Sequence, residues 1–495
     1  MRFASILWLA CAAIADAQTP TLTAADVQSV IQSAAKSVNA GMSIAVTDRQ
    51  GNILGVFQTP GAPATSIGNF GVPVNTNDLA VALARTTGFF SNDQAPLTSR
   101  TVRSISASHF PAGVMFTESG PLYGIENTNR GCSLNANFVP GQAIPPATLT
   151  NSATCGNSRR HACSSGIGLG IITGKADLLD SDQAAVNPGG IPLFKGGVVA
   201  GGVGVAGVPT NTAEFVALSG AVGAGLGPPS GVIFLGGIAL PEVVQTTQPA
   251  GTSPGPGIGM YIVPATASPG PAPEGYLVAP VAGPIGGLTQ AEVEGIVAAA
   301  IATANQTRAA IRLPAGSTAR MSIAVADLDG TLIALNRMPD GTFFSVDVAV
   351  AKARNVIYFT QAGLPNGVPA GTAVTNRTIG FGSQPLYPSG IDYTQPGPFF
   401  SLYQYDTANP CTQGGQAPNP NQNGIVFFPG SVPLYKNGVL VGGLGVSGDG
   451  VDQDDYVTAQ AAIGFAAPSK ITADNLIVRG VRLPYLKFPR DPTVP

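Results

Sequence analysis

Two aspartates in the C-terminal half of the chain have a spacing that could support phosphoryl transfer. The stretch SIAVADLDGTLIAL, 322–335, is an apolar run that ends in a turn containing Asp327 and Asp329. A strand that delivers an aspartate nucleophile is a feature of phosphohydrolases that form an aspartyl phosphate. The acidic stretch GDGVDQDD, 448–455, could then bind a metal ion, with Lys436 between the two stretches. The competing interpretation is a β-hairpin whose turn contains aspartates.

The chain contains one sequence pattern twice, in the same order, and this repeat helps to decide between the two interpretations. The matching stretches, first copy before second, are LTAADV at 22 and LTQAEV at 288, MSIAVTDRQGNILGVF at 42 and MSIAVADLDGTLIALN at 321, AVALAR at 80 and AVAKAR at 349, TSRTV at 98 and TNRTI at 375, PLY at 121 and 385, GGIPLFKGGVVAGGVGVAG at 189 and GSVPLYKNGVLVGGLGVSG at 430, and GGIALP at 236 and RGVRLP at 479. The repeat predicts two homologous domains, 18–245 and 287–495. Residues 246–286 are rich in Pro, Gly and Ala, which is typical of a partly extended linker.

The first copy lacks the residues that a phosphohydrolase needs. Gln50 stands where the second copy has Asp329, although the first aspartate and the glycine of the turn are kept as Asp48 and Gly51. The counterpart of the acidic stretch, GVPTNTAE, has no carboxylate before Glu214. An Asp and a Gly at a turn are what a hairpin requires. The hairpin is therefore favoured, and a phosphohydrolase that uses Asp327 and Asp329 stays as a minor alternative.

The residue pattern of each copy predicts an α+β domain with helices packed on an antiparallel sheet. Each copy opens with a helix capped by Thr23 or Thr289, with an acidic residue three positions later as in a capping box. A hairpin, a second helix, another hairpin, a last helix and a short strand follow. The glycine runs GGVGVAG and GGLGVSG fall on a strand after a hairpin, so close backbone packing explains them better than a dinucleotide-binding loop does.

Composition limits the classes of protein that fit. Charged residues make up 10 % of the 495 residues, against roughly 25 % in an ordinary soluble domain, while Gly (64) and Pro (43) are abundant. The net charge of −3 offers no basic face for nucleic acid. No apolar run approaches the roughly 20 residues that would span a bilayer. We therefore expect neither a nucleic-acid partner nor a transmembrane span.

The N-terminus has the pattern of a secretory signal peptide, residues 1–17. Arg2 supplies the positive end, an apolar stretch follows, and ADA at 15–17 is a small-x-small cleavage site. We expect an exported protein, periplasmic or extracellular. A lipoprotein attached through Cys11 is a minor alternative, because Trp8 is an unfavourable residue three positions before that cysteine.

Four cysteines remain after the signal segment, and an even number in an exported protein favours disulfides. Cys155 and Cys163 would close a local loop around GNSRRHA, and Cys132 with Cys411 would then tie the two copies together. Three pairings are possible, so the connectivity stays open. A zinc site is less favoured, because the spacings match no standard zinc finger and only His161 lies nearby.

Each copy resembles the GlcG/HbpS-like haem-binding family. The shared pieces are the opening helix, MSIAVADLDGTLIALNRM, the AVAKAR helix and, most specifically, VPLYKNGVLVGGLGVSGDGVDQDD. The resemblance covers most of 288–467 and, more loosely, 22–224. It implies an α+β domain with a profilin-like layout that assembles into dimers or larger oligomers, so the fused copies would form an intramolecular pseudo-dimer. It also implies binding of haem or another tetrapyrrole, without an established enzyme activity.

Candidate haem ligands follow from that resemblance. Histidine is the commonest ligand of haem iron, and the chain has only His109 and His161, both in the first copy, so two equivalent His-ligated haems are impossible. His109 is the best single candidate, and its simpler interpretation is a hydrogen-bonded or solvated loop histidine. Tyr123 and Tyr387, which end the repeated PLY, complete the set. A haem bound by the second copy would need one of these residues as its ligand: Tyr387, Tyr435, Met321 or Met338.

Arg100 and Arg377 occupy equivalent places in the two copies, inside SRT and NRT. An arginine at such a place could bind a carboxylate or a propionate through two parallel hydrogen bonds. A structural ion pair is the favoured alternative. Lys195 and Lys436, which precede the tight hairpin turns, are expected to be solvated.

The sequence thus predicts an exported protein of two tandem α+β domains that binds haem or another small ligand without catalysis. A structural or interaction module that has lost its ligand is the second hypothesis, and the phosphohydrolase is the third. The sequence has no Gly-x-Ser-x-Gly elbow, no Walker lysine loop and no His-rich metal-binding helix.

Overall fold

The structure of the protein, a computed structural model, describes residues 19–68, 73–125, 132, 134, 188–409, 411–417 and 419–494. The expected signal segment and the predicted loop with Cys155, His161 and Cys163 lie outside these residues. Within the described ranges, no helix is both long and apolar enough to cross a membrane.

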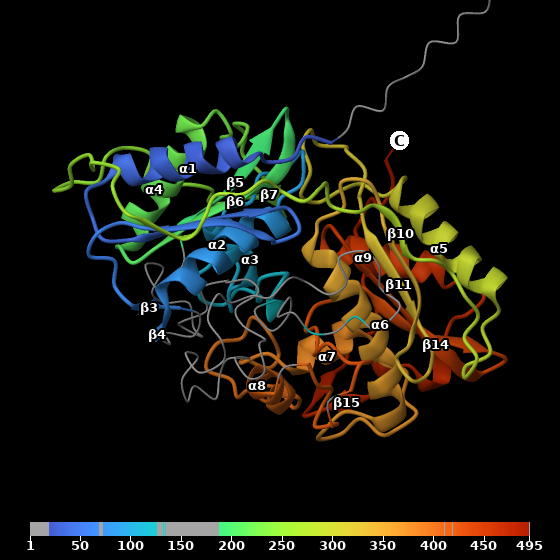
Figure 1. The fold of residues 1–495 in the computed structure, drawn as a ribbon. Helices are drawn as coiled ribbons and strands as arrows, with labels where there is room; N and C mark the ends of the chain where they lie inside the picture. The colour runs from blue at the N-terminus through green and yellow to red at the C-terminus, as the bar shows by residue number, and fades with distance from the viewer. Residues whose placement is uncertain are drawn as a thin grey trace, which may run out of the picture.

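Two five-stranded antiparallel sheets form the framework of the molecule (Figure 1). In spatial order, the strands of the first sheet are β5 (Gly190–Lys195), β6 (Val198–Ala206), β1 (Ser43–Asp48), β2 (Ile53–Gln58) and β9 (Met260–Val263). Those of the second are β13 (Ser431–Lys436), β14 (Val439–Ser447), β11 (Ser322–Ala326), β12 (Leu332–Arg337) and β10 (Gly275–Val278). The two orders match strand for strand. The predicted antiparallel α+β layout is confirmed, and we call each sheet with its helices the N-terminal or the C-terminal unit.

The two sheets also share their pairing register. Ser43 faces Ala206 across β1 and β6, as Ser322 faces Ser447 across β11 and β14. A register shift interrupts the β1–β2 and the β11–β12 hairpin at equivalent places. Residues of the two units can therefore be compared position by position. The duplication inferred from the sequence stays a prediction, because a shared topology does not reveal its origin.

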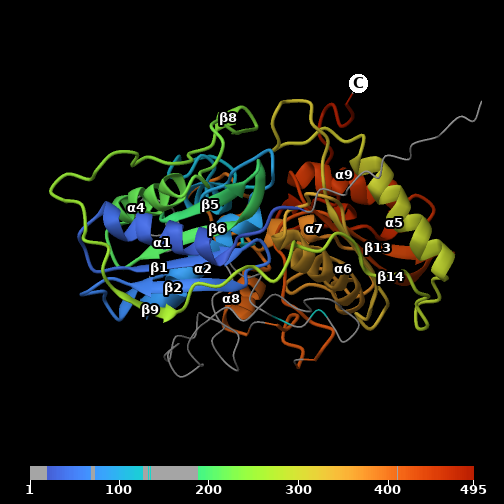
Figure 2. The same ribbon diagram turned by 45° about the horizontal axis from the view of Figure 1, so that its top comes forward.

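Helices cover both faces of each sheet (Figure 2). In the N-terminal unit, α1 (Ala24–Ser37) and α4 (Thr210–Gly223) pack on one face and α2 (Thr76–Phe90) packs on the other. In the C-terminal unit, α5 (Gln290–Ala304) and α9 (Val451–Ala461) lie opposite α6 (Phe344–Ala362). Each unit is thus a three-layer sandwich, with two helices on one face of the sheet and one long helix on the other face.

Shorter elements complete the described chain. They are the hairpin β3 (Thr65–Ile67) and β4 (Pro73–Asn75), the helices α3 (Ser99–Ser106), α7 (Asn376–Gly382) and α8 (Phe400–Ala408), the hairpins β7 (Phe234–Leu235) with β8 (Ile238–Ala239) and β15 (Ile477–Val478) with β16 (Val481–Arg482), and 3-10 turns at Ser469–Ile471 and Ala473–Asn475. The last two hairpins contain the repeated GGIALP and RGVRLP.

The predicted capping boxes are present at Thr23 and Thr289. Their carboxylates also bind the lysines that precede the second hairpin turn, at 2.6 Å from Lys195 Nζ to Asp26 and 2.7 Å from Lys436 Nζ to Glu292. Both lysines are partly exposed to solvent, and each also forms an ion pair that the sequence did not predict. In each unit, this ion pair between the lysine and the capping carboxylate ties the start of the first helix, α1 or α5, to the edge strand of the sheet.

Glycines let α2 and α6 approach the sheet closely. A Cβ on Gly204 would lie 2.1 Å from the carbonyl oxygen of Ala80 in α2, and one on Gly445 would lie 2.1 Å from that of Ala349 in α6. Such distances are below any van der Waals contact, so only glycine fits at these two places. The glycine runs therefore serve close backbone packing, as the sequence indicated.

A buried arginine holds the turn of the central hairpin in each unit. Arg85 Nε of α2 donates to the carbonyl of Gly51 at 2.9 Å, and Arg354 Nε of α6 donates to that of Gly330 at 2.9 Å. Burial lowers the pKa of Arg85 to about 9 and that of Arg354 to about 10. Both turn glycines have positive φ, 85° and 81°. This arrangement explains why both copies keep a glycine at the turn and an arginine in the helix.

The segment between the repeats contributes a strand to each unit. Its strand β9 pairs with β2, and its strand β10 pairs with β12, so each sheet ends in linker residues. Leu277 of β10 is buried in the C-terminal core, and Tyr261 of β9 packs edge-on against Phe57 at 5.0 Å. The segment between the repeats is therefore part of both folded units.

The two units contact each other through aromatic residues at the ends of α2 and α6. Phe90 stacks on Phe344 with ring centroids 4.1 Å apart, and Phe89 lies 5.5 Å from Phe343. All four side chains belong to one buried cluster that both units share. The C-terminal end of α2 thus meets the N-terminal end of α6. A symmetric pseudo-dimer would bring equivalent ends together, so this part of the contact is asymmetric.

Buried charges frame the aromatic contact. Asp340 of the C-terminal unit accepts hydrogen bonds from Arg49 of the N-terminal unit at 2.7 Å and from Arg312 at 2.6 Å. The backbone N–H of Asp93 also donates to Asp340, at 3.0 Å. Burial alone would raise the pKa of Asp340, but the two arginines outweigh it and lower that pKa. The network therefore fixes the orientation of one unit on the other through a carboxylate that stays charged.

We expect Phe90→Ala to destabilise both units together. Truncation of a buried phenylalanine costs about 3–5 kcal/mol, because contacts are lost and a cavity remains. Chemical denaturation followed by circular dichroism measures the loss in the free energy of unfolding. Phe234→Ala is the control, because Phe234 is exposed and its truncation should change that free energy by less than about 0.5 kcal/mol. Equal effects of the two substitutions would contradict the assigned contact between the units.

Candidate functional site

Arg100 and Arg377 bind carboxylates of their own units. Arg100 Nε lies 2.7 Å from Glu214 of α4, and Arg377 Nε lies 2.5 Å from Asp455, the equivalent residue of α9. Arg377 also pairs with Asp452 at 2.6 Å. The acidic partners raise the pKa of Arg377 despite the opposing effect of its burial. The two arginines therefore act alike, as structural links between α3 and α4 and between α7 and α9.

The repeated SRT and NRT segments also hold the last hairpin of each unit. Thr98 and Thr101 donate to the carbonyls of Glu242 and Pro241 at 2.5 and 2.7 Å. Thr375 and Thr378 make the same bonds in the other unit, to the carbonyls that follow β16, at 2.6 and 2.7 Å. The matching residues thus serve the fold, and neither arginine is free to clamp a ligand in this structure.

His109 is buried where the two units meet. Its Nε2 lies 2.7 Å from Asp392 of the C-terminal unit, and Asp392 also accepts the backbone N–H of Phe116 at 2.7 Å. Burial alone would raise the pKa of Asp392, but the hydrogen bonds from His109 and from the backbone of Phe116 outweigh it and lower that pKa. This position matches the simpler interpretation of His109, a hydrogen-bonded loop histidine.

The candidate tyrosines have aromatic or backbone partners within the fold. Tyr123 stacks on Tyr403 with centroids 5.4 Å apart, and Tyr387 donates its hydroxyl to the carbonyl of Val478 at 3.0 Å. In the C-terminal core, Met338 Sδ accepts the backbone N–H of Met321 at 3.4 Å. None of the predicted haem residues is among the described residues that line the cavity of the N-terminal unit.

Asp327 and Asp329 serve the hairpin turn. The strand β11 that precedes them runs antiparallel to both of its neighbours, in contrast to the parallel sheet expected of such a phosphohydrolase. Asp327 is fully buried and accepts the N–H groups of Ile285 and Gly286 at 2.9 and 2.7 Å, which ties the linker to the turn. Among the described residues, no cluster of three or more His, Cys, Asp or Glu could bind a metal ion. These observations give the phosphohydrolase hypothesis no support.

One disulfide is present in the described part of the chain. It joins Cys132 to Cys411, whose Cα atoms are 5.4 Å apart, and so links a residue of the first copy to the long irregular segment of the second. This pairing is one of those that the sequence left open. A disulfide of this kind stabilises mainly by restricting the unfolded chain, here over a separation of 279 residues.

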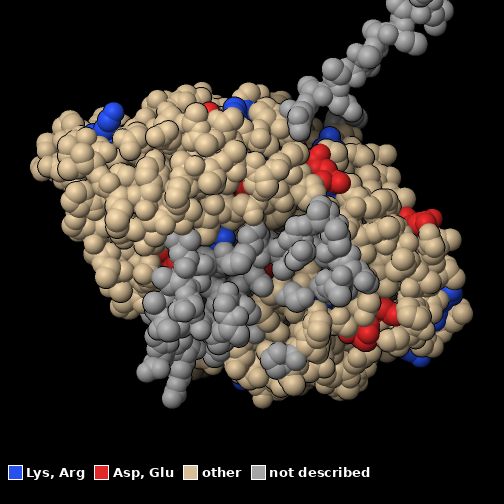
Figure 3. Space-filling model, in the orientation of Figure 1, with Lys and Arg blue, Asp and Glu red and all other residues tan. Residues whose placement is uncertain are grey.

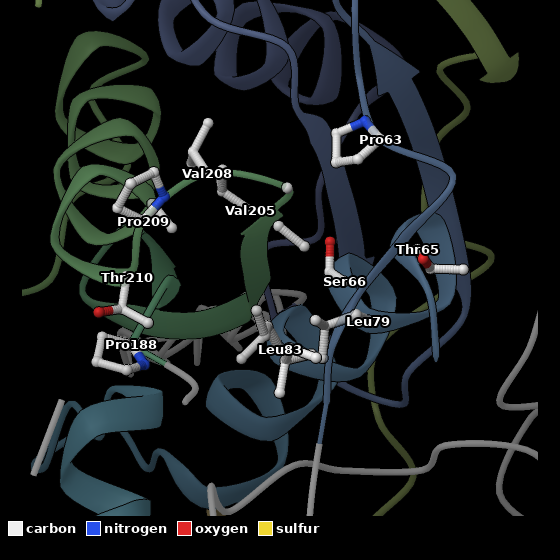
Figure 4. A pocket seen from close by; sticks show the side chains of 14 residues that line it. Pro63, Thr65, Ser66, Leu79, Leu83, Pro188, Val205, Val208, Pro209 and Thr210 are labelled. Carbon is white, nitrogen blue, oxygen red and sulfur yellow. The ribbon is translucent and has the colours of Figure 1, made fainter. Parts of the chain in front are cut away.

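An apolar cavity of about 370 Å³ lies in the N-terminal unit (Figure 4). The β3–β4 hairpin, α2, the end of β6 and the start of α4 surround it. Leu79 and Leu83 point into it from α2, and Val208 and Thr210 lie on the side of α4. Ala213 of α4 also lines it. Its described lining residues carry no ionisable side chain, and the hydroxyls of Thr65, Ser66 and Thr210 are its polar side-chain groups. A cavity of this size and lining suits a small, largely apolar ligand.

The equivalent place in the C-terminal unit is filled by charged residues. In the shared register, Lys352 stands for Leu83, Asp454 for Ala213 and Asp449 for Val208. Lys352 Nζ lies 3.0 Å from Asp454 and 2.9 Å from the carbonyl of Val446, and it sits 4.9 Å above the ring of Phe428. Side chains from the N-terminal unit, Phe89 and Phe90 among them, cover this end of the C-terminal unit. The two units thus share one backbone plan, but the N-terminal unit has a cavity at this place and the C-terminal unit has a buried ion pair.

Sequence analysis missed these positions although the repeat displayed them. AVALAR and AVAKAR differ only at Leu83 and Lys352, and the stretches that follow the glycine runs differ at Ala213 and Asp454. A lysine in an otherwise apolar helix, opposite a leucine in the matching copy, is the signal that could have located the cavity. The pairing with Asp454 required the tertiary structure.

The surface of the molecule agrees with this distribution of charge. Most of the face seen in Figure 3 is uncharged, with a few scattered acidic and basic side chains. Many of the chain's charges are instead paired in the interior, as Lys352 is with Asp454 and Arg312 is with Asp340. A sparse outer charge and a paired inner one are consistent with the low charged fraction of the sequence.

The comparisons with known proteins identify the C-terminal unit. Residues 288–463 match a family model described as "Haem degrading protein HbpS-like". This part of the chain is an HbpS-like domain. The match begins just before α5 and ends just after α9, so it covers the C-terminal unit apart from β10 and the terminal hairpin. No curated protein matches the chain.

Three solved structures are similar to part of this chain. A PduOC:haem complex is 21 % identical, over 36 % of this chain and 95 % of its own, with a TM-score of 0.24. Protein ORFY of Klebsiella pneumoniae is 19 % identical, over 36 % and 90 %, with a TM-score of 0.24. A double mutant of Streptomyces reticuli HbpS is 17 % identical, over 36 % and 85 %, with a TM-score of 0.22.

The cavity does not fit haem, the group that the family description brings to mind. Haem iron takes His, Cys, Met or Tyr as its protein ligand, and none of these is among the described lining residues. Its propionates favour Arg or Lys, which are absent from the same set. His109 instead binds Asp392. The donors of this cavity therefore suit an uncharged ligand without iron.

The buried Lys352–Asp454 pair should behave as a unit. We expect Lys352→Leu alone or Asp454→Ala alone to cost about 3–5 kcal/mol, because each leaves an uncompensated buried charge. The double variant, which copies the residues of the other unit, should cost much less than the sum. Urea denaturation of the four proteins measures the coupling. Additive costs would contradict the pairing.

The stability of the C-terminal unit should depend on pH through Asp454. Burial raises the pKa of Asp454 to about 6, although Lys352 opposes the shift. A raised carboxyl pKa in the folded state contributes stability that is fully present below the unfolded pKa and is lost as pH rises through the folded value. We therefore expect this contribution to fall as the pH rises from about 4 to about 7. Asp454→Asn should flatten the pH dependence of the free energy of unfolding, and an unchanged dependence would contradict the assignment.

Proposed function

We propose that this protein is an exported, non-enzymatic binding protein whose N-terminal unit takes a small, uncharged apolar ligand into its cavity. The observation that carries the proposal is the contrast between the two units at one place in a shared backbone. Where the HbpS-like domain buries Lys352 against Asp454, the N-terminal unit has Leu83 and Ala213 around an apolar space. Replacement of a buried ion pair by apolar residues removes the cost of desolvating two charges.

The surrounding structure supports a preformed site. The cavity lies between the start of α4 and the end of β6, both positioned by the sheet, so little ordering would accompany binding. Thr65, Ser66 and Thr210 offer hydroxyls at its edge, and Ser66 already shares a hydrogen bond with Thr76 at 2.9 Å. A ligand with one hydroxyl or carbonyl group could bind these groups while its apolar body fills the space.

Haem is the second candidate ligand, because residues 288–463 match a family of HbpS-like haem degrading proteins. His109 would be its ligand only after release from Asp392, which lies 2.7 Å away. A hemin titration followed in the Soret region separates the two ligands. The apolar-ligand proposal predicts that any hemin binding is insensitive to substitutions in the cavity.

Export is part of the proposal and rests on the N-terminal sequence. The small-x-small site at 15–17 follows an apolar stretch, and the disulfide between Cys132 and Cys411 suits an oxidising compartment. Mass spectrometry of secreted protein would detect a mature N-terminus at Gln18.

We expect Leu83→Lys with Ala213→Asp to abolish binding of an apolar probe. The double variant rebuilds in the N-terminal unit the ion pair that the C-terminal unit already contains, so the fold has a precedent for it. Titration with the uncharged fluorophore N-phenyl-1-naphthylamine should give a saturable signal in the native protein and at least about tenfold weaker binding in the variant. Val222→Lys, on the exposed surface of α4, is the control and should bind normally.

Ala213→Leu provides a second variant if the charged pair prevents folding. The larger side chain fills part of the cavity without adding charge, and it should also weaken the probe. Equal probe binding by the native protein and by both cavity variants would overturn the proposal. Absence of any saturable binding, together with an intact fold, would favour a structural module without a ligand.

A further inference from the structure

Two loops, one from each unit, form an exposed apolar projection. Residues 108–117 of the N-terminal unit correspond to 385–394 of the C-terminal unit, in the same register as α3 and α7. In this register Tyr387 matches Phe110, so the pairing of PLY at 121 with PLY at 385 that the sequence suggested was wrong. Their tips lie side by side, with the rings of Phe116 and Tyr393 in an edge-to-face contact at 6.1 Å. We call the exposed side chains of the two tips the aromatic knob. Its members are Val114, Met115, Phe116, Ile391 and Tyr393.

The two loops share an unusual backbone conformation. Phe116 and Tyr393, at equivalent positions, have φ of 60° and 65°, a region that bulky residues rarely adopt. Gly113 and Gly390 precede them with φ of 75° and 83°. The same strain at the same place in both units, each time at an exposed aromatic residue, points to a function of the tips rather than of the core.

Bonds beneath the knob hold the two loops together. Asp392 accepts hydrogen bonds from His109 and from the backbone N–H of Phe116, each at 2.7 Å. The hydroxyl of Ser389 accepts the N–H of Ser119 at 3.1 Å. The aromatic rings are therefore presented by a base that both units build, and His109 has a structural role there.

The knob is highly exposed and uncharged. Phe116 is 62 % exposed and Tyr393 is 84 % exposed, and the other three members are each close to half exposed. Within 110–117 and 386–394, Asp392 is the only charged side chain, and it is buried. The exposed Glu118 follows the first loop, and its side chain lies against Gly390 at the base of the second. Such an apolar surface on adjacent loop tips marks an interaction site.

The loops also satisfy polar backbone groups internally. Thr117 and Thr394 donate their hydroxyls to the carbonyls of Val114 and Ile391, each at 2.7 Å. The N–H of Val114 donates to Pro111, and that of Ile391 to the equivalent Pro388. A backbone that pairs within the loop can enter a medium with little water at a lower cost. This property favours a lipid surface as the partner. A protein partner would gain affinity from unpaired backbone groups, and these loops pair such groups internally.

We propose that the aromatic knob inserts into the interfacial region of an uncharged lipid bilayer and so anchors the protein peripherally. Phe and Tyr rings are stable at this depth, where an apolar ring and a polar hydroxyl both find partners. Because the knob carries no basic residue, its binding depends on buried apolar area rather than on charge. The inference is independent of the ligand in the cavity.

Sedimentation with phosphatidylcholine vesicles tests the proposal. The mature protein should pellet with the vesicles, and the bound fraction should persist in about 1 M salt, where the Debye length is only about 3 Å. Phe116→Ser with Tyr393→Ser should reduce the vesicle affinity at least about tenfold. Ile463→Ser with Ile477→Ser is the matched control, because both isoleucines are more than 70 % exposed but lie outside the knob.

Phe116→Trp gives a second measurement that does not depend on folding of the double variant. The chain's single tryptophan, Trp8, lies in the expected signal segment, so the introduced indole would be the only one in the mature protein. Its emission should shift to the blue on addition of vesicles and be quenched by brominated lipid. An unchanged spectrum, equal pelleting of the knob and control variants, or loss of self-association in the knob variant without vesicle binding would overturn the proposal.

Discussion

The approach of one long helix to a glycine-bearing strand is the constraint on which each unit depends. At Gly204 and Gly445, any side chain would overlap a carbonyl oxygen of α2 or α6, so the helix lies directly on the sheet. The closeness puts Arg85 and Arg354 within hydrogen-bond reach of the turn of the central hairpin. Helix, strand and turn are thereby fixed as one body, and the other two helices pack on the opposite face.

This shared frame makes the differences between the units informative. The last helix of each is tied by the same arginine and carboxylate, Arg100 with Glu214 and Arg377 with Asp455. Near the start of that helix the units diverge. One contains an apolar cavity and the other a buried ion pair that the partner unit covers. A backbone of one design can thus keep a ligand-sized space in one copy and use the same place for domain packing in the other.

The contact between the two units has two parts that differ in symmetry. At the ends of α2 and α6 the contact is asymmetric, with Phe90 on Phe344 and the network of Asp340 beside it. At the loops of the aromatic knob, equivalent residues of the two units touch. His109, which the sequence suggested as an iron ligand, belongs to the second region, where it supports Asp392.

The sequence by itself determined the local structure and the repetition. The capping threonines, the Asp and Gly of each hairpin turn, the glycine runs and the amphipathic helices depend on neighbours close in the chain, and each was found where it was predicted. The carboxylate partners of Arg100 and Arg377, the pairing of Lys352 with Asp454 and the contact of His109 with Asp392 join residues between 75 and 283 positions apart. The linker strands β9 and β10 also depend on residues distant in the chain, because they pair with β2 and β12 at the edges of the two sheets. Tertiary structure decided these features, because charge and shape are matched across space and a one-dimensional pattern does not record which residues meet.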